Sequence, residues 1–109
     1  MEQIKKITQG IIDFRNERDW EQFHNSKDLA ISINVEASEL LELFLWKKHN
    51  EVDIDKLKEE LADVFICSLM LADKHDLDVE SIIEEKMQKN AKKYPTEKAK
   101  GNCKKYTEF

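Results

Sequence analysis

The sequence contains few of the residues that make turns, cross-links or metal knuckles. Its 109 residues include two glycines, one proline and two cysteines. A protein of many strands needs more turn residues than this, so a sheet architecture is disfavoured. Cys67 and Cys103 stand far apart and neither belongs to a CxxC motif, which argues against a disulfide framework and a zinc knuckle. We interpret both as free thiols in a reducing compartment.

Long apolar runs and excess positive charge are also missing. No apolar run approaches the roughly 20 residues of a membrane span, and the opening MEQIKKITQG lacks the apolar core of a signal peptide. We therefore expect a cytoplasmic protein without a membrane partner. The formal net charge of −5 gives no electrostatic reason to expect binding to a nucleic acid polymer.

Residues that favour α-helices dominate the composition of the chain. Charged residues make up 38% of the chain, and its length suits one domain over residues 1–109. Apolar residues at helical spacing predict four helices, at about 2–17, 27–48, 54–75 and 79–92. The expected N-terminal caps are Asn25 or Ser26 for the second helix, Asp53 or Asp55 for the third, and Asp78 for the fourth. Tyr94-Pro95 should stop the fourth helix, leaving an extended or frayed polar tail over 96–109.

The third helix is apolar almost all round from Val64 to Ala72. A helix of this kind is buried on every side, which four short helices cannot readily achieve alone. The sequence therefore predicts an all-α four-helix bundle that assembles as a homodimer or tetramer, with the third helix central.

Two pairs of acids are the candidates for chemistry. Glu36 and Glu39 lie about 60° apart on one side of the second helix, and Glu60 and Asp63 repeat this spacing on the third. Both pairs share their side with apolar residues, which are Leu29, Ile33, Leu40 and Leu43 on one helix and Leu57, Val64, Cys67 and Leu71 on the other. Unpaired buried carboxylates are costly, so antiparallel packing of the two helices would require a neutralising partner.

A divalent cation would satisfy four converging carboxylates. Ligation by oxygen alone, without cysteine or clustered histidine, favours Mg²⁺ or Mn²⁺ over zinc. Protein-bound magnesium is commonly shared with substrate phosphates, which indicates a nucleotide or pyrophosphate ligand. The alternative is that the acids are solvated or paired with lysines, since glutamates at this spacing are common on exposed helix faces.

At this point the sequence resembles a known family. ExxE followed by ExxD within EELADVF is similar to the signature of the all-α nucleoside triphosphate pyrophosphohydrolases, the MazG-like superfamily. The blocks RDWEQFHNSKDLA, EASELLELFLW and KMQKNAKKYP resemble, in order, those of its compact branch, which includes dCTP pyrophosphatases. The likeness extends from about Phe14 to Gly101.

The resemblance implies an Mg²⁺ enzyme that cleaves between the α and β phosphates and releases a nucleoside monophosphate and pyrophosphate. Glu36, Glu39, Glu60 and Asp63 would hold the metal, with Glu39 and Asp63 the candidate catalytic carboxylates. Lys86, Asn90 and Tyr94, spaced by four, would form a stripe that meets the triphosphate beside Lys93. The base would be held by the segment from Trp20 to His24 and by Trp46.

The sequence departs from the dCTP-specific members at two positions. They carry a histidine where Ile11 stands and a tyrosine where Cys67 stands. This puts preference for cytosine in doubt, so dCTP and modified dCTP remain expectations. The alternatives are a non-catalytic helical interaction module and, within the family, a dUTPase-like or phosphoribosyl-ATP activity, against which the aromatic blocks argue.

Overall fold

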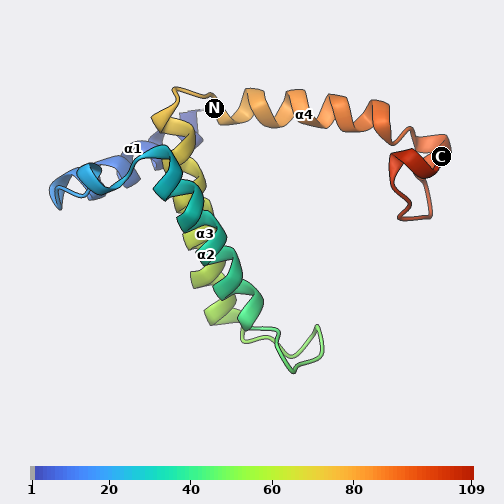
Figure 1. Cartoon of the computed structure of the whole chain (residues 1–109), viewed down its shortest axis with the longest axis horizontal. Coiled ribbons are helices and arrows are strands. Elements are labelled where there is room, and N and C mark those ends of the chain that lie inside the picture. The colour runs from blue at the N-terminus through green and yellow to red at the C-terminus, as the bar shows by residue number, and fades with distance from the viewer. Residues whose placement is uncertain (1) are drawn as a thin grey trace. The chain divides into compact units, whose positions relative to one another are not determined.

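The chain is all-helical in the computed structural model, which describes residues 2–109 (Figure 1). It contains five α-helices, α1 (Glu2–Glu17), α2 (Ser26–Glu42), α3 (Ile54–Lys74), α4 (Val79–Lys93) and α5 (Thr96–Ala99), and two short 3₁₀ helices, η1 (Glu21–Phe23) and η2 (Tyr106–Glu108). None of the described residues forms a strand. The all-α prediction is confirmed, but the expected count of four α-helices is wrong because the tail adds α5.

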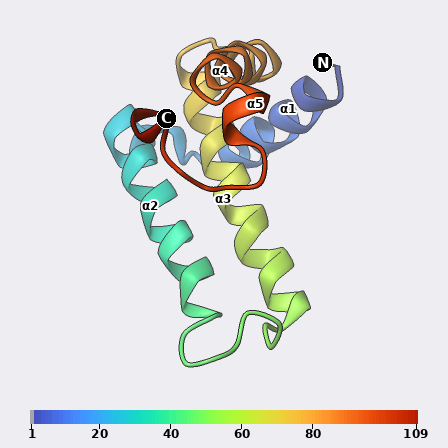
Figure 2. The same cartoon turned by 90° about the vertical axis from the view of Figure 1, so that its right-hand side faces the viewer.

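The first compact unit of the chain ends at Leu77 and is built around an antiparallel pair of helices. Figure 2 shows α2 and α3 side by side, joined at one end by the 43–53 loop. At the opposite end, Ser26 Oγ and His75 Nε2 lie 2.8 Å apart and connect the start of α2 to the end of α3. Helix α1 also packs on α3.

Side-chain caps fix where the two central helices begin. The Asn25 side chain accepts a hydrogen bond of 2.9 Å from the Asp28 amide, and Asp53 accepts one of 3.0 Å from the Asp55 amide. Each cap satisfies an amide that has no partner within the helix. Of the alternatives left open by the sequence, Asn25 and Asp53 are therefore the caps.

Helix α2 ends earlier than its apolar pattern predicted. The helix was expected to continue to Lys48, but it ends at Glu42. The Leu43, Phe44 and Leu45 amides each bond to the carbonyl three residues earlier, so the winding tightens. Trp46 then takes φ +64°, a left-handed conformation that a right-handed helix cannot contain.

The core of the first unit is small. Ile12, Leu29 and Met70 are buried together, with Ile11, Cys67 and Leu71 packed against them. Leu29 is the most enclosed, at 1% exposed. The residues expected to share a side with the acids are buried or half-buried, which confirms the inward face of both helices.

The second compact unit comprises Asp78–Phe109 and is described by itself. Asp78 occupies the N-cap of α4, where its carboxylate accepts a hydrogen bond of 2.6 Å from Ser81 Oγ. Helix α4 ends at Lys93 before Pro95, as predicted. The prediction of an extended tail is wrong. The Tyr94 ring packs edge-to-face on Tyr106 and Phe109, with centroids 6.1 and 5.8 Å away, and folds the tail against the end of α4.

No helix within residues 2–109 combines the length and the apolar character needed to cross a bilayer. The assignment of the whole chain to one domain stays a prediction.

Candidate metal centre

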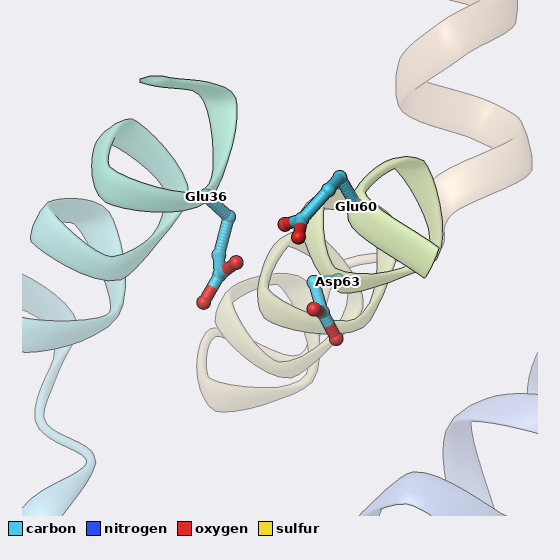
Figure 3. Close-up of side chains that lie close together, drawn as sticks. All are labelled: Glu36, Glu60 and Asp63. Atoms are coloured by element: carbon cyan, nitrogen blue, oxygen red, sulfur yellow. The ribbon is translucent and has the colours of Figure 1, made fainter. Parts of the chain in front are cut away.

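Three carboxylates from the two central helices converge on one small volume. Glu36 extends from α2 toward Glu60 and Asp63 on α3 (Figure 3). One oxygen from each residue lies within 4.8 Å of the others. The two acids on α3 are three residues apart and so project from the same side of the helix. The antiparallel packing of α2 then supplies the third carboxylate, as the sequence predicted.

Two oxygens in this acid cluster are enclosed and have no partner. Glu36 Oε2 and Glu60 Oε2 are both removed from solvent and neither has a hydrogen-bond partner in the described chain. A buried acceptor left without a donor costs about 1 to 3 kcal/mol, and more when it carries charge. These atoms therefore require a proton or a cation that the described residues do not provide.

The electrostatics of the cluster favour such a cation. Burial raises the pKa of Glu36 from 4.5 to about 7, assisted by an interaction with the Glu39 carboxyl and by the negative charges of Glu39, Asp63 and Glu60. Burial also raises the pKa of Glu60, followed by the interaction with the Glu39 carboxyl and by the negative charges of Glu39, Asp63 and Glu59. Repulsion among these carboxyls favours a bound proton, and a bound cation would relieve the same repulsion.

The fourth predicted ligand, Glu39, is placed differently. It is exposed, whereas Glu36 is half-buried, and it is outside the set whose oxygens approach within 4.8 Å. Its interaction with both Glu36 and Glu60 nevertheless places it at the edge of the cluster. Its role as a ligand therefore stays a prediction.

The donor set of the cluster suits a hard cation. Mg²⁺ and Mn²⁺ prefer carboxylate oxygens and water, which is what Glu36, Glu60 and Asp63 offer. Cys67 lies nearby, but burial and the charges of Glu36 and Asp63 raise the pKa of its thiol. A protonated thiol is a poor metal ligand, so the site presents oxygen ligands only.

The aromatic residues predicted to hold the base are in varied surroundings. Trp20 packs edge-to-face on Phe14, with centroids 5.9 Å apart, and is 44% exposed. His24 Nδ1 is enclosed but has no hydrogen-bond partner among residues 2–109. Trp46 is fully exposed in the 43–53 loop, so its indole has no wall to pack against within the described chain. The structure does not gather these three side chains into one pocket.

The residues predicted to hold the phosphates lie in the second unit. Lys86 and Asn90 are on α4, and the Tyr94 amide donates to the Asn90 carbonyl at 2.8 Å. The helical hydrogen bonding thus continues to the Tyr94 amide, although Tyr94 itself leaves helical geometry at φ −123° and ψ 66°. The stripe of three side chains stays a prediction. The Lys93 ammonium lies 4.9 Å from the centre of the Tyr106 ring. Whether this stripe reaches the acids stays a prediction.

Comparison with known proteins adds an independent line of evidence to this geometry. The pattern of the MazG-like family matches residues 31–109, which include all four predicted metal ligands and the α4 stripe. The chain belongs to the MazG-like family.

Two curated relatives of this MazG-like chain are dCTP pyrophosphatase 1 of Homo sapiens, 38% identical over 105 residues, and dCTP pyrophosphatase 1 of Mus musculus, 36% identical over 105 residues. Each alignment covers 89% of this chain and 62% of the relative, so the chain spans less than two thirds of their length. The crystal structure of a pyrophosphatase from Archaeoglobus fulgidus superimposes with a TM-score of 0.80 at 34% identity. That match covers 85% of this chain and 93% of the other.

Sequence reasoning missed one feature of the second unit. Lys92, Lys98, Tyr106 and Phe109 line a pocket that the tail forms when it folds back. The sequence does repeat two lysines and a tyrosine, in KKYP and in KKYT. This repeat could have indicated that the tail folds back and brings the two segments together.

Proposed function

We propose that the protein is a nucleoside triphosphate pyrophosphohydrolase that depends on Mg²⁺, or alternatively Mn²⁺, and cleaves between the α and β phosphates. The observation that carries the proposal is the convergence of three carboxylates from two helices, two of which have enclosed oxygens without partners. The names of the curated relatives and of the solved pyrophosphatase support the same reaction class.

In this proposal Glu36, Glu60 and Asp63 hold the cation, and Glu39 completes the set from its exposed position. A bound Mg²⁺ would offset the charge of the phosphate oxygens and lower the pKa of a coordinated water. Glu39 and Asp63 are the carboxylates that orient the attacking water and hold its proton. Glu39 suits this task because solvent reaches it while it still interacts with the enclosed acids.

For the substrate we infer a deoxynucleoside triphosphate, with dCTP or modified dCTP as the first candidates. Trp20, His24 and Trp46 are the residues we infer for the base, the indoles by stacking and the His24 ring by a hydrogen bond to the base edge. Because Trp46 is fully exposed and His24 Nδ1 is enclosed in the single chain, this arrangement requires a rearrangement on binding or a neighbouring copy. Lys86, Asn90, Lys93 and Tyr94 receive the phosphate chain. Ile11 and Cys67, where the dCTP-specific members differ, pack at the core of the first unit, so they shape the site without polar contacts to a base.

We also infer that the active protein is a homo-oligomer, a dimer or a tetramer. Leu61 and Phe65 are one turn apart on α3 and are 40% and 59% exposed, and Leu41 on α2 is 62% exposed. Apolar side chains of this size are normally covered, and a second copy would cover them. Light scattering from the protein at micromolar concentration should give a mass of two or four chains. A single-chain mass would contradict the inference.

The reaction is tested with purified protein, Mg²⁺ and a panel of triphosphates, with the phosphate products separated. The proposal expects pyrophosphate and a nucleoside monophosphate, and a loss of activity of at least about 100-fold in Asp63→Asn, since a lost metal ligand removes charge stabilisation. Glu59→Gln, which removes a nearby exposed charge on the same helix, should remain active. Release of orthophosphate would point to another hydrolase.

The alternative of a non-catalytic module requires that the acids pair with basic side chains. Two ion pairs within residues 2–109 join Arg15 to Glu21 and Arg18 to Glu17, and neither involves the acid cluster. The enclosed oxygens of Glu36 and Glu60 have no hydrogen-bond partner among the described residues. A module of this kind predicts no hydrolysis and no change in thermal stability with Mg²⁺, so the same assays distinguish the two.

A further inference from the structure

The charge of this chain is divided sharply along its length. Residues 86–109 contain eight lysines and two glutamates, whereas residues 1–85 contain 21 acidic and 10 basic residues. A chain that is acidic overall therefore ends in a strongly basic segment. A concentration of lysines in one segment attracts anions locally, whatever the net charge of the protein.

The structure folds part of this basic segment into a pocket. The Tyr94 ring holds Tyr106 and Phe109 against the end of α4. The result is a pocket of about 370 Å³, which we call the lysine pocket. It is lined by Lys92, Lys93, Pro95, Lys98, Tyr106 and Phe109.

Three lysines line this pocket, and no acidic side chain is among the described residues that do so. The Lys93 ammonium lies 4.9 Å from the centre of the Tyr106 ring, which also lines the pocket. Lys92 and Lys93 complete the last turn of α4, where cations also complement the helix dipole. The dipole of α4 does not account for Lys98, which comes from α5 and reaches the same pocket. Convergence of lysines from two elements instead indicates an anion that draws charge from both.

The chemistry of the lining indicates which anion this is. Three cations around one small volume repel each other, and a group that carries several negative charges relieves the repulsion better than a single phosphate does. Tyr106 and Phe109 supply aromatic surface beside the lysines, and both rings are partly exposed, at 46% and 38%. A diphosphate group has the charge and the several acceptor oxygens that three lysines can share.

We propose that the lysine pocket binds a diphosphate group, either as free pyrophosphate or as part of a nucleotide. This adds Lys92 and Lys98 to the phosphate-binding residues, and it rests on the proposed function for the source of the diphosphate. The aromatic surface gives the two sources different signatures, because a nucleotide can also place its base on Tyr106.

The test is calorimetric titration of the full chain with pyrophosphate, orthophosphate and dCDP, in excess EDTA. Without divalent metal the acid cluster cannot recruit a phosphate, so any binding reports the lysines. We expect pyrophosphate to bind at least about tenfold more tightly than orthophosphate. Lys98→Gln should weaken pyrophosphate binding about tenfold, the loss typical of a charge-assisted contact. Lys104→Gln, which removes a lysine of the same tail that does not line the pocket, should weaken it less than about twofold.

The outcomes separate the two sources and the two proposals. Tighter binding of dCDP that Tyr106→Leu abolishes, with circular dichroism unchanged, assigns the pocket to a nucleotide, and equal or tighter pyrophosphate binding assigns it to the free ion. The proposal that the lysine pocket binds a diphosphate would be overturned if Lys98→Gln and Lys104→Gln lost equal affinity for pyrophosphate. Equal affinity of the wild type for orthophosphate and pyrophosphate would also overturn it. Hydrolysis of triphosphates by the wild type would still stand in that case, because it depends on the acid cluster.

Discussion

Replacing Glu36 by glutamine should make the metal-free protein more stable and remove its response to Mg²⁺. Glutamine keeps the size of the side chain but carries no charge, so the repulsion among Glu36, Glu60 and Asp63 falls. The enclosed Oε2 atom becomes part of an amide that is cheaper to bury than a carboxylate. A single substitution thus tests both the destabilisation that the buried charge causes and the binding of Mg²⁺ by the acid cluster.

The magnitude follows from the raised pKa of Glu36. A rise from 4.5 in the unfolded chain to about 7 in the folded one means that the folded state holds the proton more tightly. The contribution of Glu36 to the free energy of unfolding is therefore fully present below about pH 4.5 and is lost as the pH rises through about 7. The full linkage is roughly 3 kcal/mol, and solvent screening of this partly exposed group reduces it to about 1 kcal/mol. Glu36→Gln should recover that amount at about pH 8 and nothing at about pH 4.

The assay is thermal unfolding of the wild type and Glu36→Gln, with EDTA and with about 10 mM Mg²⁺. In EDTA at about pH 8 the variant should melt about 4 °C higher. Mg²⁺ should raise the free energy of unfolding of the wild type by about 1.4 kcal/mol if its dissociation constant is near 1 mM, and should leave that of the variant unchanged. Glu59→Gln is the matched control, since it removes an exposed charge from α3 and should keep the response to Mg²⁺. A variant that is less stable than the wild type in EDTA, yet responds fully to Mg²⁺, would refute this reasoning.

Three further predictions concern the metal, the core and a helix cap. The affinity for Mg²⁺ should fall roughly eightfold between about pH 7.5 and pH 6, because the proton on Glu36 competes with the ion, and calorimetry would contradict this if the affinity stayed flat. Leu29→Ala should destabilise the protein by about 2 to 5 kcal/mol in chemical denaturation, since Leu29 is 1% exposed, whereas the 50% exposed Ile31 replaced by alanine should cost far less. Asn25→Ala should cost about 1 kcal/mol by removing the α2 cap, while Asn25→Asp should restore most of it, and equal stability of all three proteins would argue against the cap.

Much of the fold was readable from local signals. Asn25, Asp53 and the Tyr94-Pro95 step mark helix boundaries through contacts with residues at most four positions away, so the sequence alone reveals them. The end of α2 carries no such mark, because no glycine or proline precedes the left-handed Trp46. The folded tail depends on Tyr94 meeting residues 12 and 15 positions later, which no local pattern predicts.

The acid cluster, too, was predictable from the sequence only in part. Periodicity was sufficient to turn Glu36, Glu60 and Asp63 inward, because each shares its side of a helix with core residues. It could not distinguish Glu39 from Glu36, which lie only about 60° apart on an ideal helix. Only the folded structure shows that Glu36 is half-buried while Glu39 is exposed.

The indole of Trp46 is fully exposed, so its fluorescence can report on the surroundings of the 43–53 loop. The chain has two tryptophans, and Trp20 already packs on Phe14, so fluorescence quenched by iodide comes mainly from Trp46. A base or a second subunit that covered this ring would shift its emission to the blue and protect it from the quencher. Occupancy of the loop can thus be followed in the unmodified protein, without a label.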